Sequence, residues 1–275
     1  MAAANVGGED VHATSVFESA ACPGTSCTLH TWKPLGPPRG VVVIYHGYAS
    51  HSAYPTTRHA AVMLQSKGFM CMALDLPGHG TSQGTRGLIR SAAHLTGDGV
   101  AVARHAKEAH PGLPFFLFGN SMGGAIALNV ARAAPELRPT GLVLLAPMLS
   151  IPEASMPPAW QVPLLQGIAC IMPGAALLGG NATNPAVQYA DPVRRAECEA
   201  DTLAYSGNLR LASANAILTT ATVPHTLANK PWQTLLPPHP SAAAILPTPP
   251  ISSYLFLLTP SCIVFPVPGL HYPRG

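Results

Sequence analysis

One serine stands in a pattern that can make it a nucleophile. Residues Gly119 to Gly123 read Gly-Asn-Ser-Met-Gly and fit the pattern G-x-S-x-G. An apolar run at 115–118 precedes it, and a small-residue segment with helical spacing follows at 122–133. In that context the pattern marks a tight strand-to-helix turn that lifts the serine hydroxyl above a sheet. We therefore predict that Ser121 is a nucleophile; the alternative is a glycine-rich packing turn.

The groups that would stabilise the reaction can also be located. A serine that attacks an ester creates an oxyanion, which two backbone N–H groups typically hold. The N–H of Met122, directly after the serine, is the first candidate. The second is the N–H of Tyr48, because His46-Gly47-Tyr48 follows an earlier apolar strand and Gly47 permits a close approach. The alternative is that this loop is an ordinary connection between a strand and a helix.

The base and the acid that such a serine needs are not identifiable in the sequence. An acid and then a histidine are expected after the serine. Asp201 is the last acidic residue, and it lies in a cap-like or helical segment. Glu153 as acid and His271 as base are the alternatives that remain, each in an unfavourable context. Two other histidines follow the serine, His225 and His239. We interpret the histidines of the upstream loops, which are His46, His51 and His79, as loop anchors.

The elements that must position these residues alternate along the chain. Continuous apolar runs at 40–45, 69–74, 115–118 and 141–145 are typical of strands buried on both faces. Helical spacing is found at 57–67, 91–108 and 122–133. Apolar pairs around a turn region at 16–32 predict an opening hairpin. The alternation predicts an α/β fold with a mostly parallel, doubly wound sheet.

Composition divides the chain into four segments. We expect an N-terminal hairpin and connector at 1–39, an α/β core at 40–148, a cap with a following helical segment at 149–219, and a Pro-rich atypical tail at 220–275. The stretch 154–190 is uncharged, but prolines and glycines interrupt it too often for a spanning helix of about twenty apolar residues. We interpret it as an apolar cap that touches a membrane surface peripherally.

Charge and cysteine content exclude several classes of function. The formal net charge is +3, only 10% of residues are charged, and no basic cluster is present, which argues against a nucleic-acid partner. The six cysteines show no CxxC pair, so we expect no metal site. The first twenty residues lack the basic and apolar regions of a secretory signal, which favours a cytoplasmic location, with membrane association through the cap.

Several motifs together resemble the monoacylglycerol lipase and lysophospholipase group of α/β-hydrolases, particularly its plant and algal members. They are found in order at 46–52, 75–82, 119–124, 146–148, 191–192 and 205–211. The resemblance implies the α/β-hydrolase fold with an inserted apolar cap. It also implies cleavage of a small-molecule acyl ester, with one acyl chain on glycerol or glycerophospholipid, and no metal or organic cofactor.

The chain departs from that group after residue 219. There the group should offer a strand followed by an aspartate, and then a strand followed by the catalytic histidine, and neither pattern is found. We therefore expect the last strands of the sheet to be missing. The alternative function is a truncated, catalytically weak or inactive fragment that at most binds lipid or a partner.

Overall fold

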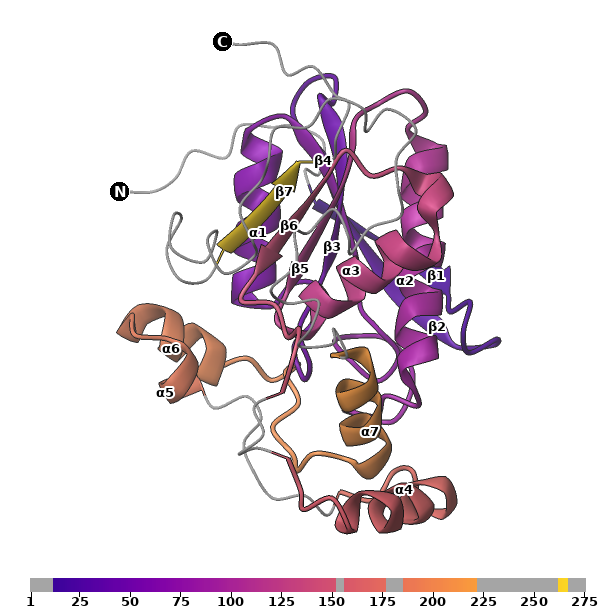
Figure 1. The fold of residues 1–275 in the computed structure, drawn as a ribbon. Coiled ribbons are helices and arrows are strands. Elements are labelled where there is room, and N and C mark those ends of the chain that lie inside the picture. The colour runs from indigo at the N-terminus through magenta and orange to yellow at the C-terminus, as the bar shows by residue number, and fades with distance from the viewer. Residues whose placement is uncertain (1–11, 152–155, 177–184, 222–261, 267–275) are drawn as a thin grey trace, which may run out of the picture.

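A seven-stranded sheet forms the centre of the molecule (Figure 1). The computed structural model describes residues 12–151, 156–176, 185–221 and 262–266. The strand order is β1-β2-β4-β3-β5-β6-β7, in which β4, β3, β5 and β6 are parallel and β1, β2 and β7 run antiparallel to their neighbours. The strands are β1 (His12–Glu18), β2 (Ser26–Trp32), β3 (Gly40–Tyr45), β4 (Phe69–Leu74), β5 (Phe115–Asn120), β6 (Gly141–Leu145) and β7 (Cys262–Pro266).

Helices cover both faces of this sheet and one of its ends (Figure 1). The helix α1 (Pro55–Ser66) lies on one face, and α2 (Ala92–Ala109) and α3 (Met122–Ala133) lie on the other. Four helices beyond the sheet's end form the cap region: α4 (Gln161–Ile171), α5 (Pro185–Gln188), α6 (Pro192–Glu199) and α7 (Leu211–Thr220). A short 3-10 helix, η1 (Pro135–Leu137), precedes β6.

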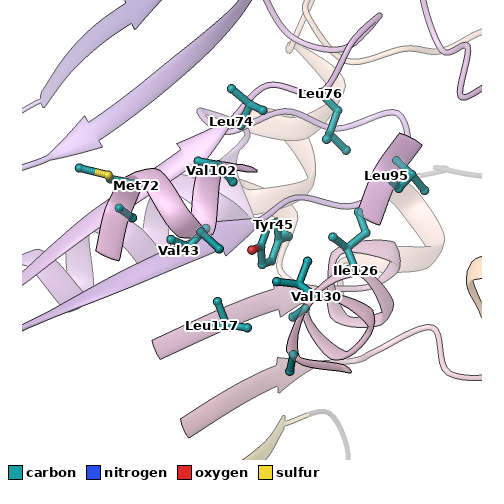
Figure 2. Packing of buried hydrophobic residues seen from close by; sticks show 14 of the residues in the cluster. Val43, Tyr45, Met72, Leu74, Leu76, Leu95, Val102, Leu117, Ile126 and Val130 are labelled. Atoms are coloured by element: carbon teal, nitrogen blue, oxygen red, sulfur yellow. The ribbon is translucent and has the colours of Figure 1, made fainter. Parts of the chain in front are cut away.

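The alternation of side chains along β3 divides the core into two layers. Val41, Val43 and Tyr45 pack against α2 and α3, whereas Val42 and Ile44 pack against α1. Figure 2 shows Tyr45 at the middle of the first layer, with Val43, Ile126 and Val130 around it. The strand is therefore buried on both faces, which explains its continuous apolar sequence.

The predicted strands and helices of the first 145 residues are confirmed, with shifts of up to four residues at some ends, the largest at the start of the opening hairpin. The prediction for the tail needs a correction. We expected the Pro-rich tail at 220–275 to add no strand at this edge, but β7 pairs antiparallel with β6 there. Its sequence, Cys-Ile-Val-Phe-Pro, contains β-branched and aromatic residues that favour a strand, and its proline stands at the strand's end, where proline is tolerated. The apolar run at 251–258, which is the other candidate for a strand in the tail, lies outside the described residues.

Candidate active site

The predicted nucleophile lies where the direction of winding reverses. β3 and β5 are neighbours in the sheet, yet the chain leaves β3 through α1 on one face and leaves β5 through α3 on the other. Open α/β sheets bind ligands at such a reversal, beyond the carboxyl ends of the strands. Ser121 follows β5 and the loop at 46–54 follows β3, so the sheet brings both predicted parts of the site to this position.

The backbone at Ser121 is strained and tightly packed. Its φ of 54° and ψ of −120° are unusual for a residue with a side chain and cost about 1–3 kcal/mol. A Cβ on Gly119 would lie 2.1 Å from the carbonyl oxygen of Gly123, and one on Gly123 would lie 2.0 Å from that of Tyr45. Only glycine fits at both positions. The turn leaves Ser121 itself exposed.

Hydrogen bonds to the neighbouring strand hold this turn. The N–H of Ser121 donates to the carbonyl of Leu145 at 3.0 Å, and its carbonyl accepts from the N–H of Met148 at 2.9 Å. Met122 is the first residue of α3, where a backbone N–H has no partner within the helix and the helix dipole is positive. Because its side chain is fully buried, the backbone N–H is the group of Met122 that can act on a bound molecule.

The loop after β3 passes directly beside the serine. A Cβ on Gly47 would lie 3.4 Å from Cβ of Ser121 and 3.9 Å from its Oγ. The side chain of Tyr48 is occupied elsewhere, since its hydroxyl donates to the carbonyl of Gly87 at 3.0 Å and burial raises its pKa to about 12. What Tyr48 can offer to a ligand near Ser121 is therefore its backbone N–H.

A cavity of about 940 Å³, open to solvent, separates these loops from the cap region. The core contributes Ser121 and residues of the loop after β3, and the cap region contributes residues from α5 to α7. On the cap side the lining includes Tyr189, Cys198, Glu199, Asp201, Leu209 and Ile217. Ser121 is thus reached through a chamber whose far wall is the cap.

A buried carboxylate that sequence reasoning did not single out fixes two loops around the site. Asp75 follows β4 and accepts hydrogen bonds from the N–H groups of Ser52 at 2.7 Å and Thr81 at 2.9 Å. Burial alone would raise the pKa of Asp75, but the hydrogen bond from His30 and the nearby His46 hold it well below its usual range. The signal in the sequence is an aspartate directly after an apolar strand.

A second feature, also missed from the sequence, ties the core to the cap region. Nε2 of His51 lies 2.9 Å from Oδ2 of Asp201, and His51 is only 2% exposed. The main chain at Tyr205 is tied in the same place, because its N–H donates to the carbonyl of Ala49 at 2.8 Å. The interpretation of His51 as a loop anchor agrees with these contacts.

A base for Ser121 is not identified within the described residues, because none of those that line the cavity is a histidine. The alternatives Glu153 and His271, like His225 and His239, lie outside the described residues. The structure therefore brings together Ser121, Met122, Gly47 and Tyr48. The base and the acid that the serine needs are not assigned to any described residue. Nor do three potential metal-ligating side chains gather anywhere in the described part of the chain.

Comparison with known proteins shows that the sequence of this chain is similar to those of hydrolases. A family model described as serine aminopeptidase, S33, matches residues 36–231. The chain is 31% identical to human monoglyceride lipase over 170 residues, 59% of this chain and 54% of the human protein. It is 30% identical to a monoacylglycerol lipase of Mycolicibacterium smegmatis over 199 residues, 72% of this chain and 68% of that one.

A search of solved structures agrees on the fold. A thermostable carboxyl esterase from Bacillus coagulans superposes with a TM-score of 0.64 at 20% identity, covering 83% of this chain and 77% of the esterase. The sheet is therefore that of an α/β-hydrolase. The chain spans about half the length of the human lipase that it matches.

Proposed function

Since the chain belongs to the serine aminopeptidase S33 family of hydrolases, we propose that it is a serine hydrolase that cleaves carboxylic esters through an acyl-enzyme at Ser121. The observation that carries the proposal is the position of this serine. It stands exposed on a strained turn at the floor of a large cavity, between the first N–H of a helix and the loop that follows β3. Such a turn is the usual place of the nucleophile in this fold.

The reaction would proceed in two halves. Oγ of Ser121 bonds to the ester carbonyl carbon and gives up its proton to a base, and the N–H groups of Met122 and Tyr48 hold the oxyanion. The tetrahedral intermediate then expels the alcohol, which takes the proton, and leaves an acyl group on Ser121. Water attacks the acyl-enzyme in the same way and releases the acid. Gly47 serves by letting the loop approach the serine closely.

The cavity favours an ester with an uncharged head group. Two carboxylate residues, Glu199 and Asp201, are among the described residues that line it, whereas no lysine or arginine is. A phosphate would therefore meet no cationic partner there, although phosphates are usually bound by such groups. Of the two substrate types that the sequence suggests, monoacylglycerol fits this wall better than lysophospholipid. The names of the human and bacterial relatives agree with this choice.

The cap supports a peripheral contact with a membrane surface. None of the residues of α4 is buried, although the helix is largely apolar. Next to it Trp160 is 71% exposed, and at its end Ile171 is 83% exposed. Exposed apolar groups of this kind mark interaction surfaces. No described helix is both long and apolar enough to cross a bilayer.

One observation favours a second candidate, a catalytically weak or inactive fragment that at most binds lipid or a partner. No histidine is among the described residues that line the cavity with Ser121. An oxyanion hole and a binding site without the base still accelerate hydrolysis, by about 10³–10⁴-fold over water in a serine protease. This candidate therefore predicts slow but measurable turnover.

The test is hydrolysis of 1-monooleoylglycerol and of lysophosphatidylcholine by the full chain and by Ser121→Ala. We expect the glycerol ester to be cleaved faster and Ser121→Ala to abolish cleavage. A matched control is Ser206→Ala, which removes another serine hydroxyl from the cavity wall and should leave the rate within about twofold. Equal rates for Ser121→Ala and the unaltered chain would refute the proposal.

A further inference from the structure

We infer that His46 is a positioning residue that turns the peptide between Gly47 and Tyr48 so that the Tyr48 N–H faces the site of the oxyanion. The inference rests on the proposed function, in which this N–H stabilises the transition state. It assigns a role to a side chain that the sequence analysis treated only as an anchor of its loop. The inference depends on two hydrogen bonds, one peptide plane and the packing around the ring.

The two hydrogen bonds of His46 fix where its proton lies. The backbone N–H of Leu76, which can only donate, points at Nε2 at 3.1 Å, so this nitrogen is the acceptor. The proton is then on Nδ1, which lies 2.8 Å from the carbonyl oxygen of Gly47 and donates to it. His46 is fully buried, and this burial lowers its pKa to about 4, which agrees with a neutral ring.

The carbonyl that His46 holds belongs to the same peptide unit as the N–H of Tyr48. In a trans peptide these two groups point in opposite directions. A carbonyl turned toward His46 therefore turns the N–H away from it. Gly47 lies beside Ser121, and no acceptor for the Tyr48 N–H is found among the hydrogen bonds of the described residues. The Tyr48 N–H therefore points away from His46 and has no described acceptor, so it is available to donate to an oxyanion.

A second contact on the same carbonyl supports this geometry. The N–H of Ser50 donates to the oxygen of Gly47 at 3.4 Å, so that the loop folds back on the group that His46 holds. This bond is long and weak on its own. His46 therefore supplies the stronger of the two contacts that set the plane.

The packing leaves the imidazole little freedom to turn. The ring of His79 lies 5.5 Å from that of His46 and 5.8 Å from that of Tyr48, and His79 is itself buried. The carbonyl of His46 is close to α3, because a Cβ on Gly123 would lie 2.8 Å from it. The ring, the loop and the nucleophile's helix thus form one packed unit, which transmits the orientation of His46 to the peptide.

The test uses three replacements that separate the two bonds. His46→Asn places an amide N–H near the position of Nδ1 and keeps the bond to Gly47. His46→Gln places its amide group near the position of Nε2 and loses the bond to Gly47. His46→Leu removes both bonds. The measurement is the rate constant for labelling of Ser121 by a fluorophosphonate, whose phosphoryl oxygen occupies the oxyanion site, with the melting temperature recorded for each variant.

We expect His46→Leu and His46→Gln to label about a hundredfold more slowly, the effect of a misplaced or missing oxyanion donor. His46→Asn should recover most of the labelling rate. The probe concentration that gives half the maximal labelling rate should change little among the variants. If His46 has a role in folding alone, His46→Asn and His46→Gln should be labelled at the same rate when their melting temperatures are equal. That result would overturn the inference. If His46→Leu fails to fold, the comparison of Asn with Gln still decides.

Failure of the proposed function is recognised separately, as an absence of labelling in the unaltered chain. In that case crystal structures of the unaltered chain and of His46→Gln test the inference directly. We expect the Gly47 carbonyl to face His46 in the first and the peptide to be rotated in the second. The same peptide orientation in both would overturn the inference.

Discussion

The turn around Ser121 and the cap helix α4 differ in how tightly their backbones are packed. At the turn, added methyl groups on Gly119 and Gly123 would lie about 2 Å from backbone atoms. In α4 no residue is buried, and a Cβ on Gly167 would meet no atom within 4 Å. The difference teaches that the turn at the predicted nucleophile has no room for added atoms, whereas the helix α4 does.

Paired glycine replacements give the largest effect that this contrast predicts. Gly123→Ala forces a methyl group against the carbonyl of Tyr45 and should destabilise the protein by at least about 3 kcal/mol. Gly167→Ala, within the open helix α4, should stabilise it by about 0.5–1 kcal/mol. Urea denaturation measures both changes. Similar effects of the two replacements would break the contrast.

Acid should weaken the core through its buried histidines. Burial lowers the pKa of His46 to about 4 and that of His79 to about 3, whereas the unfolded chain takes up these protons near pH 6.5. The unfolded state therefore binds more protons as the pH falls from about 6.5 to 4, and stability falls by about 1.4 kcal/mol per pH unit for each histidine.

Urea denaturation at pH 7, 6 and 5 measures this slope. His79→Gln should roughly halve it, and His59→Gln, at an exposed position of α1, should leave it unchanged. A free energy of unfolding that is the same at pH 5 and pH 7 would contradict the account of these buried rings.

The link between core and cap region predicts a smaller effect. Asp201→Asn keeps the oxygen that accepts from the N–H groups of Leu203 and Ala204 but removes the charge facing His51. We expect a loss of about 1.5–3 kcal/mol and a raised KM for ester, because the cavity wall loosens. Asp191→Asn is the matched control, since the side-chain hydrogen bonds described for Asp191 are cap bonds to α6 and asparagine caps equally well. If both replacements change the stability and the KM equally, the pair of His51 and Asp201 has no special role in linking the core to the cap region.

The smallest change in stability should come from the exposed face of α4. Leu164→Ser with Ile171→Ser should alter the free energy of unfolding by less than about 0.5 kcal/mol, because both side chains are exposed. Binding to phosphatidylcholine vesicles, measured by sedimentation, should fall several-fold. Val62→Ser, on the exposed side of α1, should leave binding unchanged. Unaltered binding of the α4 variant would refute the proposed membrane surface.

The sequence predicts most of the core because each signal there is local. The strand Gly40–Tyr45 is apolar at every position since both of its faces are covered, and α3 begins at Met122, where the glycine pattern places it. The four segment boundaries, with the core at 40–148 and the cap at 149–219, stay predictions. So do the roles of Ser121, Met122, Tyr48 and Gly47.

Contacts between distant residues could not be predicted in this way. His51 and Asp201 are 150 positions apart, and neither stands in a pattern that points to the other. The bond from His46 to its neighbour Gly47 depends on the loop's conformation, which no residue type specifies. β7 was missed because the density of prolines around it conceals a short apolar run.

The central claim is that Ser121 is a nucleophile with an assembled oxyanion site, and labelling with a fluorophosphonate tests it most directly. The purified full chain is treated with the probe, digested and analysed by mass spectrometry, with Ser121→Ala beside it. The account predicts one modified peptide, carrying the probe on Ser121, and none in the variant. Folded protein that stays unlabelled, or is labelled equally in Ser121→Ala, would contradict it.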